Sequence, residues 1–153
     1  MKKLLICLAV VAFTFSCSND DDSNGGGAKI TAKINGAVKT FNIVSVDAEA
    51  GQGTGAKTEL YVIAVSGTNI ANVETITFSV EEGATGKTVV DNFDYNVTVG
   101  DKNTAYFGDE AFILDVVTNA NKKLVGTFSG TLNAEGNGTD AVVTDGAFNL
   151  IVK

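Results

Sequence analysis

The sequence has 153 residues, of which 11 are lysines and 18 are acidic, and it contains neither histidine nor arginine. A formal net charge of −7 provides no cationic patch to displace counterions from a nucleic acid, so that class of partner is excluded. The same charge argues against a peripheral grip on anionic lipid headgroups. Without histidine and arginine the chain lacks the commonest general base and the bidentate anion clamp, and we predict that it is not an enzyme.

Residues 1–16 have the pattern of a secretory signal peptide. A basic start at 2–3 is followed by the apolar run 4–15. At about 1.5 Å per residue, a helix of this length is too short for a hydrocarbon core of about 30 Å, whereas it suits the apolar region of a signal peptide. The segment ends with Ser16 and Cys17, which resembles the lipobox of bacterial lipoproteins. We therefore predict cleavage after residue 16 and lipidation of Cys17; the alternative is a buried core cysteine behind an apolar strand.

The predicted lipobox departs from the usual pattern at Thr14, where leucine is common. Cys7 lies inside the segment that is removed. The mature chain would then keep one cysteine, which is acylated, and a disulfide is ruled out. Two or three acyl groups on Cys17 would make the membrane attachment stable.

Residues 18–27 contain three successive aspartates and three successive glycines, a composition that predicts a solvated, flexible tether. Asp20, Asp21 and Asp22 resemble the acidic export tract of Bacteroidota lipoproteins, which directs them to the outer face of the outer membrane. We expect an outer-membrane protein that faces the cell exterior, with a periplasmic orientation as the alternative. After cleavage the formal charge is 9 − 18 = −9.

From Lys29 onward, short runs of alternating apolar residues are separated by Gly, Asn and Asp clusters, the pattern of β-strands and turns. Asn35-Gly36 is the clearest turn, because this pair favours the type I′ hairpin. No stretch has the apolar spacing of a helix. The predicted strands are 29–34, 37–46, 60–66, 75–80, 89–99 (one strand or two), 111–118, 123–132 and 141–153.

The alternation also predicts which residues share a buried face. Ile30, Ala32 and Ile34 would lie with Ala37, Phe41 and Ile43. In later strands Ile76, Phe78 and Val80 would share a face, as would Phe112, Leu114 and Val116. Gly126 and Gly130 fall on the large-residue face, which predicts a close approach or a bulge, and Gly146 predicts an irregularity. We predict an all-β fold, an antiparallel β-sandwich or barrel-like structure of about 8–9 strands. The predicted organisation is a signal peptide at 1–16, the lipidated cysteine and tether at 17–28, and a β domain at 29–153.

The segments 29–36, 126–132 and 143–148, together with the lipobox and acidic tether, resemble a Bacteroidota lipoprotein family that carries a domain of unknown function. The characteristic ends are Lys-Ile-Thr-Ala-Lys-Ile-Asn-Gly and Gly-Thr-Phe-Ser, the latter followed by Val-Thr-Asp-Gly-Ala-Phe. One departure is the lack of the tryptophan that often follows the first turn; Phe41 is the nearest aromatic residue. The resemblance implies an all-β fold and an envelope location, and no known activity.

Two motifs suggest ligands but are incomplete. Gly83 to Thr88 contains the tail of a phosphate-binding loop, but position 81 is glutamate where glycine is required, and a strand pattern follows in place of a helix. We interpret it as a turn, and we interpret the segment 53–58 in the same way. For Ca²⁺, the requirement is oxygen ligands on loops. Candidates are Asp91, Asp94, Asp101, Asn103, Asp109 and Glu110 in one stretch, and Asn133, Glu135, Asn137 and Asp140 in another.

We predict no cofactor, with Ca²⁺ as the alternative, because acidic and Asn-rich loops are usually solvated turns. A glycosidase pair of Asp109 or Glu110 with Asp91 is also conceivable on composition, but adjacent residues on a strand point to opposite faces. Tyr95 and Tyr106 are the predicted contacts if the protein binds a glycan.

The leading functional prediction is a non-catalytic binding or structural module on a lipid anchor, with no catalytic residues and no metal site. The alternative is a carbohydrate-binding accessory lipoprotein or a weak glycan hydrolase. The membrane is the predicted partner through Cys17, and a glycan or protein partner is left open.

Overall fold

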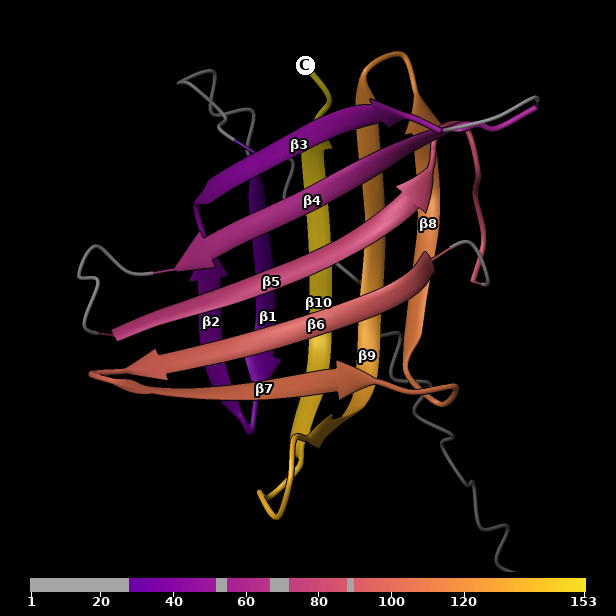
Figure 1. Ribbon diagram of the computed structural model, residues 1–153. Helices are drawn as coiled ribbons and strands as arrows, with labels where there is room; N and C mark the ends of the chain where they lie inside the picture. The colour runs from indigo at the N-terminus through magenta and orange to yellow at the C-terminus, as the bar shows by residue number, and fades with distance from the viewer. Residues whose placement is uncertain (1–27, 52–54, 67–71, 88–89) are drawn as a thin grey trace, which may run out of the picture.

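The computed structural model describes residues 28–51, 55–66, 72–87 and 90–153, which form ten antiparallel β-strands (Figure 1). Cys17 and Asp20 to Asp22 lie outside these residues. No described helix is long and apolar enough to cross a bilayer. The strands are β1 Lys29–Ile34, β2 Ala37–Phe41, β3 Ile43–Ala50, β4 Thr58–Ser66, β5 Asn72–Glu81, β6 Val90–Val99, β7 Lys102–Gly108, β8 Ile113–Ala120, β9 Lys123–Ala134 and β10 Ala141–Ile151.

The strands are arranged in two layers that face each other. One layer contains β2, β1, β10, β9 and β8, and the other contains β7, β6, β5, β4 and β3, whose strands run across those of the first layer (Figure 1). The layers are continuous because β9 pairs with β8 along its first part and with β7 at its end. The predicted class, an antiparallel β-sandwich with barrel-like character, is confirmed.

Period-two alternation places one set of side chains from each strand between the layers. Ile76, Phe78 and Val80 of β5 are each no more than 3% exposed, as predicted. Leu114 and Val116 of β8 are also buried. The largest fully buried side chains are Phe41, Ile30, Leu60, Ile76, Leu124, Leu132, Leu150, Val62, Val80, Val116 and Val143.

Phenylalanine rings join the two layers at the centre of the core. Phe78 on β5 lies 5.3 Å from Phe148 on β10, and Phe93 on β6 lies 5.1 Å from Phe128 on β9, measured between ring centroids. Tilted aromatic pairs of this kind contribute about 0.5–1.5 kcal/mol each beyond the area that they bury. These contacts hold the layers together in a chain without tryptophan.

The hairpin predicted at Asn35-Gly36 is confirmed. Both residues have positive φ, 50° and 79°, as the type I′ turn requires. Asn35 also ties the turn to β10, since its backbone amide donates to the carbonyl of Val142 and its Oδ1 accepts from the amide of Val142, each at 2.8 Å. The turn residues therefore fix the β1–β2 pair against its neighbour.

One predicted strand is wrong, and one observed strand was not predicted. The predicted strand 37–46 is two strands, because the chain passes from one layer to the other at Asn42. Ile43 consequently leaves the predicted buried face and is 57% exposed. Ala37, which was assigned to the same face, is also exposed, at the start of β2. The segment predicted as one or two strands at 89–99 is the single strand β6. The strand β7 was not predicted because its apolar residues, 105–107, are consecutive and do not alternate with polar ones. The total is ten strands among the described residues.

The predictions for the glycines are confirmed at Gly126 and Gly146. A Cβ atom at Gly126 would lie 2.3 Å from Cζ of Phe148 and 2.4 Å from the carbonyl oxygen of Asp115, so the strand pair packs closely there. At Gly146 the β9–β10 register shifts, which is the expected irregularity.

Candidate functional site

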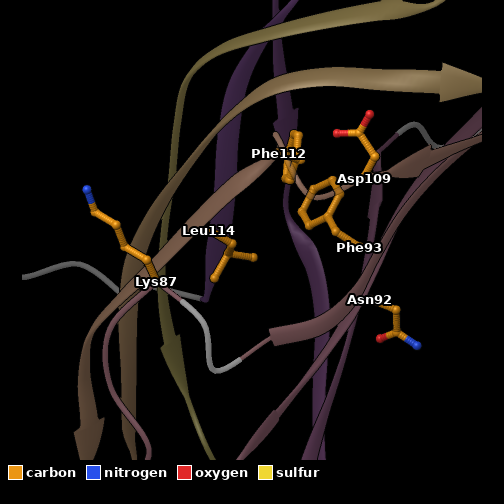
Figure 2. A pocket seen from close by; sticks show the side chains of 7 residues that line it. Lys87, Asn92, Phe93, Asp109, Phe112 and Leu114 are labelled. Atoms are coloured by element: carbon orange, nitrogen blue, oxygen red, sulfur yellow. The ribbon is translucent and has the colours of Figure 1, made fainter.

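A pocket opens at the seam where β6 and β7 of one layer meet β8 of the other. Its volume is about 330 Å³ including the opening to solvent. Figure 2 shows the Phe93 and Phe112 rings and the Asp109 carboxylate close together, with Lys87 and Asn92 on either side. The lining residues of this seam pocket are Lys87, Asn92, Phe93, Gly108, Asp109, Phe112 and Leu114.

The apolar wall of the seam pocket is aromatic. The ring centroids of Phe93 and Phe112 are 4.6 Å apart, and Phe112 is only partly buried. Two glycines let Phe112 sit close to the strands: a Cβ atom at Gly108 would lie 3.2 Å from its ring, and one at Gly130 would lie 2.9 Å from its Cα. Gly130 also has a φ of 140°, which a side chain would disfavour. This is the close approach predicted at Gly130.

Asp109 is held in place by hydrogen bonds at the mouth of the pocket. Its Oδ2 accepts from Nδ2 of Asn133 at 3.0 Å, and its Oδ1 accepts from the backbone amide of Ala111 at 2.8 Å. These hydrogen bonds keep the pKa of Asp109 below its ordinary value of 3.8, and the one from Asn133 has the largest effect. The carboxylate is therefore ionised and fixed in orientation at neutral pH.

Lys87 and Asn92 are the other polar residues that line the seam pocket. Lys87 belongs to the connection between β5 and β6, which is pinned to β8 by paired backbone hydrogen bonds between Gly86 and Val116. Asn92 lies on β6, and its Oδ1 accepts a hydrogen bond from Ser79 at 3.2 Å. A lysine, an asparagine and an aspartate thus line the same pocket as the aromatic wall. This set of groups suits a small polar ligand with an apolar face.

The two tyrosines predicted to contact a glycan lie outside the seam pocket, on the inner face of their strands. Tyr95 is 4% exposed, and its hydroxyl donates to Oε2 of Glu74 at 2.9 Å. Burial raises the pKa of Tyr95, and the hydrogen bond to Glu74 raises it further. Tyr106 is half-buried and stacks on Tyr95 at 5.5 Å. Neither lines the seam pocket, and the glycan contact predicted for this pair stays a prediction.

The candidate Ca²⁺ ligands were expected on loops, but Asp91 and Asp94 lie on β6, Asn103 on β7 and Asn133 on β9. Those that do lie between strands are used for turns. Asp109 caps the turn before β8, and Oδ1 of Asp140 accepts from the backbone amide of Ala134 at 3.0 Å. Among the described residues, no group of three or more Asp, Glu or Cys side chains is placed to hold a metal ion. The side chain of Asp91 is outside the described set.

The phosphate-loop fragment is the turn that its sequence indicated. Gly83 and Gly86 have φ values of 82° and 109°, and β6 follows from Val90. Of the proposed glycosidase residues, Asp109 lines the seam pocket and Glu110 does not.

Of the residues of the seam pocket, Asp109 was a candidate from the sequence, whereas Phe112 was predicted only to share a strand face with Leu114 and Val116. Phe93 belongs to the core. The available signal was the short Gly-Asp-Glu-Ala segment at 108–111 immediately before Phe112. It marks a turn, but it does not reveal that β6 lies alongside.

Comparisons of the chain with protein-family models, with curated proteins and with solved structures give no match.

Proposed function

We propose that this protein is a lipoprotein of the outer membrane, acylated at Cys17 and facing the cell exterior, whose β domain is a non-catalytic binding module. The anchoring part is supported by the order of features in the sequence: a basic start, a short apolar run, Ser16-Cys17 and an acidic tract. The resemblance to Bacteroidota lipoproteins supports the same location.

The binding part is carried by one observation, the seam pocket with a fixed carboxylate beside an aromatic wall. Asp109 lines it and is held by two hydrogen bonds. A glycoside hydrolase needs two carboxyl groups across the scissile bond, one of them with a raised pKa. Asp109 is the one carboxyl group among the described residues that line the pocket, and its pKa is lowered and not raised. The geometry therefore favours recognition over hydrolysis.

A saccharide is the second, more specific candidate, favoured by Phe112. Its partly exposed ring offers an apolar surface for a sugar face, while Asp109, Lys87 and Asn92 offer partners for hydroxyl groups. This corresponds to the carbohydrate-binding alternative predicted from the sequence, at residues other than the tyrosines.

The anchor is tested by metabolic labelling with palmitate. Cys17→Ala should abolish labelling and leave the precursor uncleaved, and unchanged labelling would refute lipidation at this residue. Replacing Asp20, Asp21 and Asp22 together with alanine should preserve labelling but protect the protein from protease added to intact cells. Unchanged protease sensitivity would show that the acidic tract does not direct export.

The binding function is tested by a glycan array and by thermal shift with the full chain. Lys87→Ser and Phe112→Leu should each abolish a sugar-dependent rise in melting temperature. Lys102→Ser is the matched control, since it removes an exposed lysine that does not line the pocket. A sugar response that survives both pocket variants contradicts the assignment of the site.

A further inference from the structure

One end of the domain gathers lysines from three separate parts of the chain. Lys29 begins β1 opposite Asn149 of β10, and Lys123 begins β9 opposite Ile151. The backbone amide of Val152 donates to the carbonyl of Lys122 at 2.9 Å, which fixes the last residues beside the β8–β9 turn. Figure 1 shows the C-terminus and this turn at the same end of the molecule. We call this end, defined by Lys29, Lys122, Lys123 and Lys153, the tether end.

None of these four lysines has an ion pair with a described carboxylate, which is also true of Lys87 and Lys102. Lys33, Lys39 and Lys57 each pair with an acidic residue: Asp145, Glu74 and Glu81, respectively. The side chains at the tether end are all exposed. Their charges are therefore available to a partner.

Three of the lysines surround a hollow of about 460 Å³ that includes its opening to solvent. Lys122, Lys123 and Lys153 line it, and Glu82 is the acidic residue among its lining residues. The strand β3 runs along this end, but alternation turns Asp47 and Glu49 to the face opposite buried Val46. Positive charge thus predominates around the opening of a chain that is acidic as a whole.

The tether end is also where the membrane anchor would join the domain. Lys29 follows Cys17 by twelve residues, which at about 3.3–3.6 Å per residue span at most about 43 Å. The start of β1 is therefore the part of the described domain whose distance from the bilayer the tether limits most directly. The opposite end, where Asp109 lies before β8, is farther away by roughly the length of that strand, about 25 Å.

We propose that the tether end docks on the membrane that holds the acyl groups, with Lys122, Lys123 and Lys153 contacting phosphate groups of anionic lipid headgroups. This inference rests on the proposed lipidation at Cys17. Charge complementarity and the tether length select the lipid surface as the partner. Docking this end turns the seam pocket away from the bilayer, where a soluble ligand can reach it. The net charge of the chain argued against such a contact, but the distribution of charge in the fold supports it.

The test uses the full acylated protein in vesicles of phosphatidylcholine, with or without phosphatidylglycerol. Amine-reactive labelling of each lysine is quantified by mass spectrometry, which also reports acylation of Cys17. We expect Lys122, Lys123 and Lys153 to be labelled about fivefold more slowly in the anionic vesicles. Lys102, in the β6–β7 hairpin, is the internal control and should be labelled at the same rate in both.

A triple variant separates docking by the three lysines from mere proximity to the bilayer. In the native protein Lys29, at the same end, should also be labelled more slowly in anionic vesicles, and changing Lys122, Lys123 and Lys153 to serine should remove this protection of Lys29. In the matched control, which changes Lys33, Lys87 and Lys102 to serine, Lys29 should remain protected. Acylated protein with equal labelling in both vesicles overturns the docking and leaves the anchor intact. Protein that is not acylated and stays off the vesicles overturns the anchor itself. Equal protection by inorganic phosphate without vesicles would indicate a soluble-anion site and also overturn the docking.

Discussion

Replacing Gly126 with alanine tests the close packing of β9 against its neighbours. Gly126 is opposite Phe148 on β10 and Val116 on β8, so its strand is hydrogen-bonded on both sides. The added Cβ would lie 2.3 Å from Cζ of Phe148 and 2.4 Å from the carbonyl oxygen of Asp115. Ordinary contacts between carbon atoms lie at about 3.5–4.0 Å, so the ring must move by more than about 1 Å. The carbonyl of Asp115 cannot yield as easily, because it is part of the backbone of β8.

The expected loss of stability follows from two opposing effects. Overpacking of a filled core costs about 1–3 kcal/mol, and a contact with backbone puts this site near the upper value. Alanine recovers about 0.5–1 kcal/mol relative to glycine by restricting the unfolded chain. We therefore expect Gly126→Ala to lower the free energy of unfolding by about 2 kcal/mol. For a domain of this size the melting temperature should fall by about 6–12 °C.

Urea unfolding followed by circular dichroism measures this loss. Phe148→Leu provides the control background, because leucine lacks Cζ and relieves the ring contact while the contact with Asp115 remains. Gly126→Ala should cost less in this background than in the native one. A neutral or stabilising Gly126→Ala would refute the packing argument. An equal cost in both backgrounds would show that the ring of Phe148 is not the obstacle.

Four further predictions follow from polar groups in the described structure. Burial raises the pKa of Asp94. The protonated carboxyl group therefore stabilises the fold at pH values below its ordinary pKa of 3.8, and this stabilisation is lost as the pH rises through the raised pKa. Asp94→Asn should raise the melting temperature at pH 7 and leave it unchanged at pH 3. The pKa of Asp109 is lowered, so the ionised carboxylate stabilises the fold at pH values above 3.8. Asp109→Asn should therefore lower the melting temperature at pH 7. If Asp94→Asn and Asp109→Asn shift the melting temperature in the same direction at pH 7, the opposite pKa shifts of the two carboxyl groups are contradicted. Tyr95→Phe removes the hydroxyl that donates to Glu74 and should cost about 1.5 kcal/mol in urea unfolding, whereas a cost near zero would show that the hydrogen bond is replaced by water. Asn35→Ala should lower the free energy of unfolding by about 2 kcal/mol, because it loses the side-chain hydrogen bond to β10 and places alanine at a positive φ. Asn35→Gly loses only the hydrogen bond. An equal loss of stability in both variants would exclude a contribution from backbone strain.

The sequence by itself determined the class of the fold and many of its local features. Alternation identified the buried faces of β5 and β8, and the pair Asn35-Gly36 identified the hairpin with its two positive φ values. Gly126 and Gly146 were recognised as sites of close packing and irregularity. These features depend on neighbours along the chain, where a period of two residues and the conformational freedom of Asn and Gly act directly.

Only the tertiary structure decided which strands face each other and what lies at their junctions. Alternation gives the face of a residue, but not the layer to which its strand belongs. The passage between layers at Asn42 exposes Ile43, and the pairing of β9 with both β8 and β7 creates the seam that brings Phe93 beside Phe112. The lysines of the tether end likewise come together from β1, β9 and the last residue. Their proximity arises from long-range pairing, because charge counts and spacing along the chain contain no information on which ends of the strands meet.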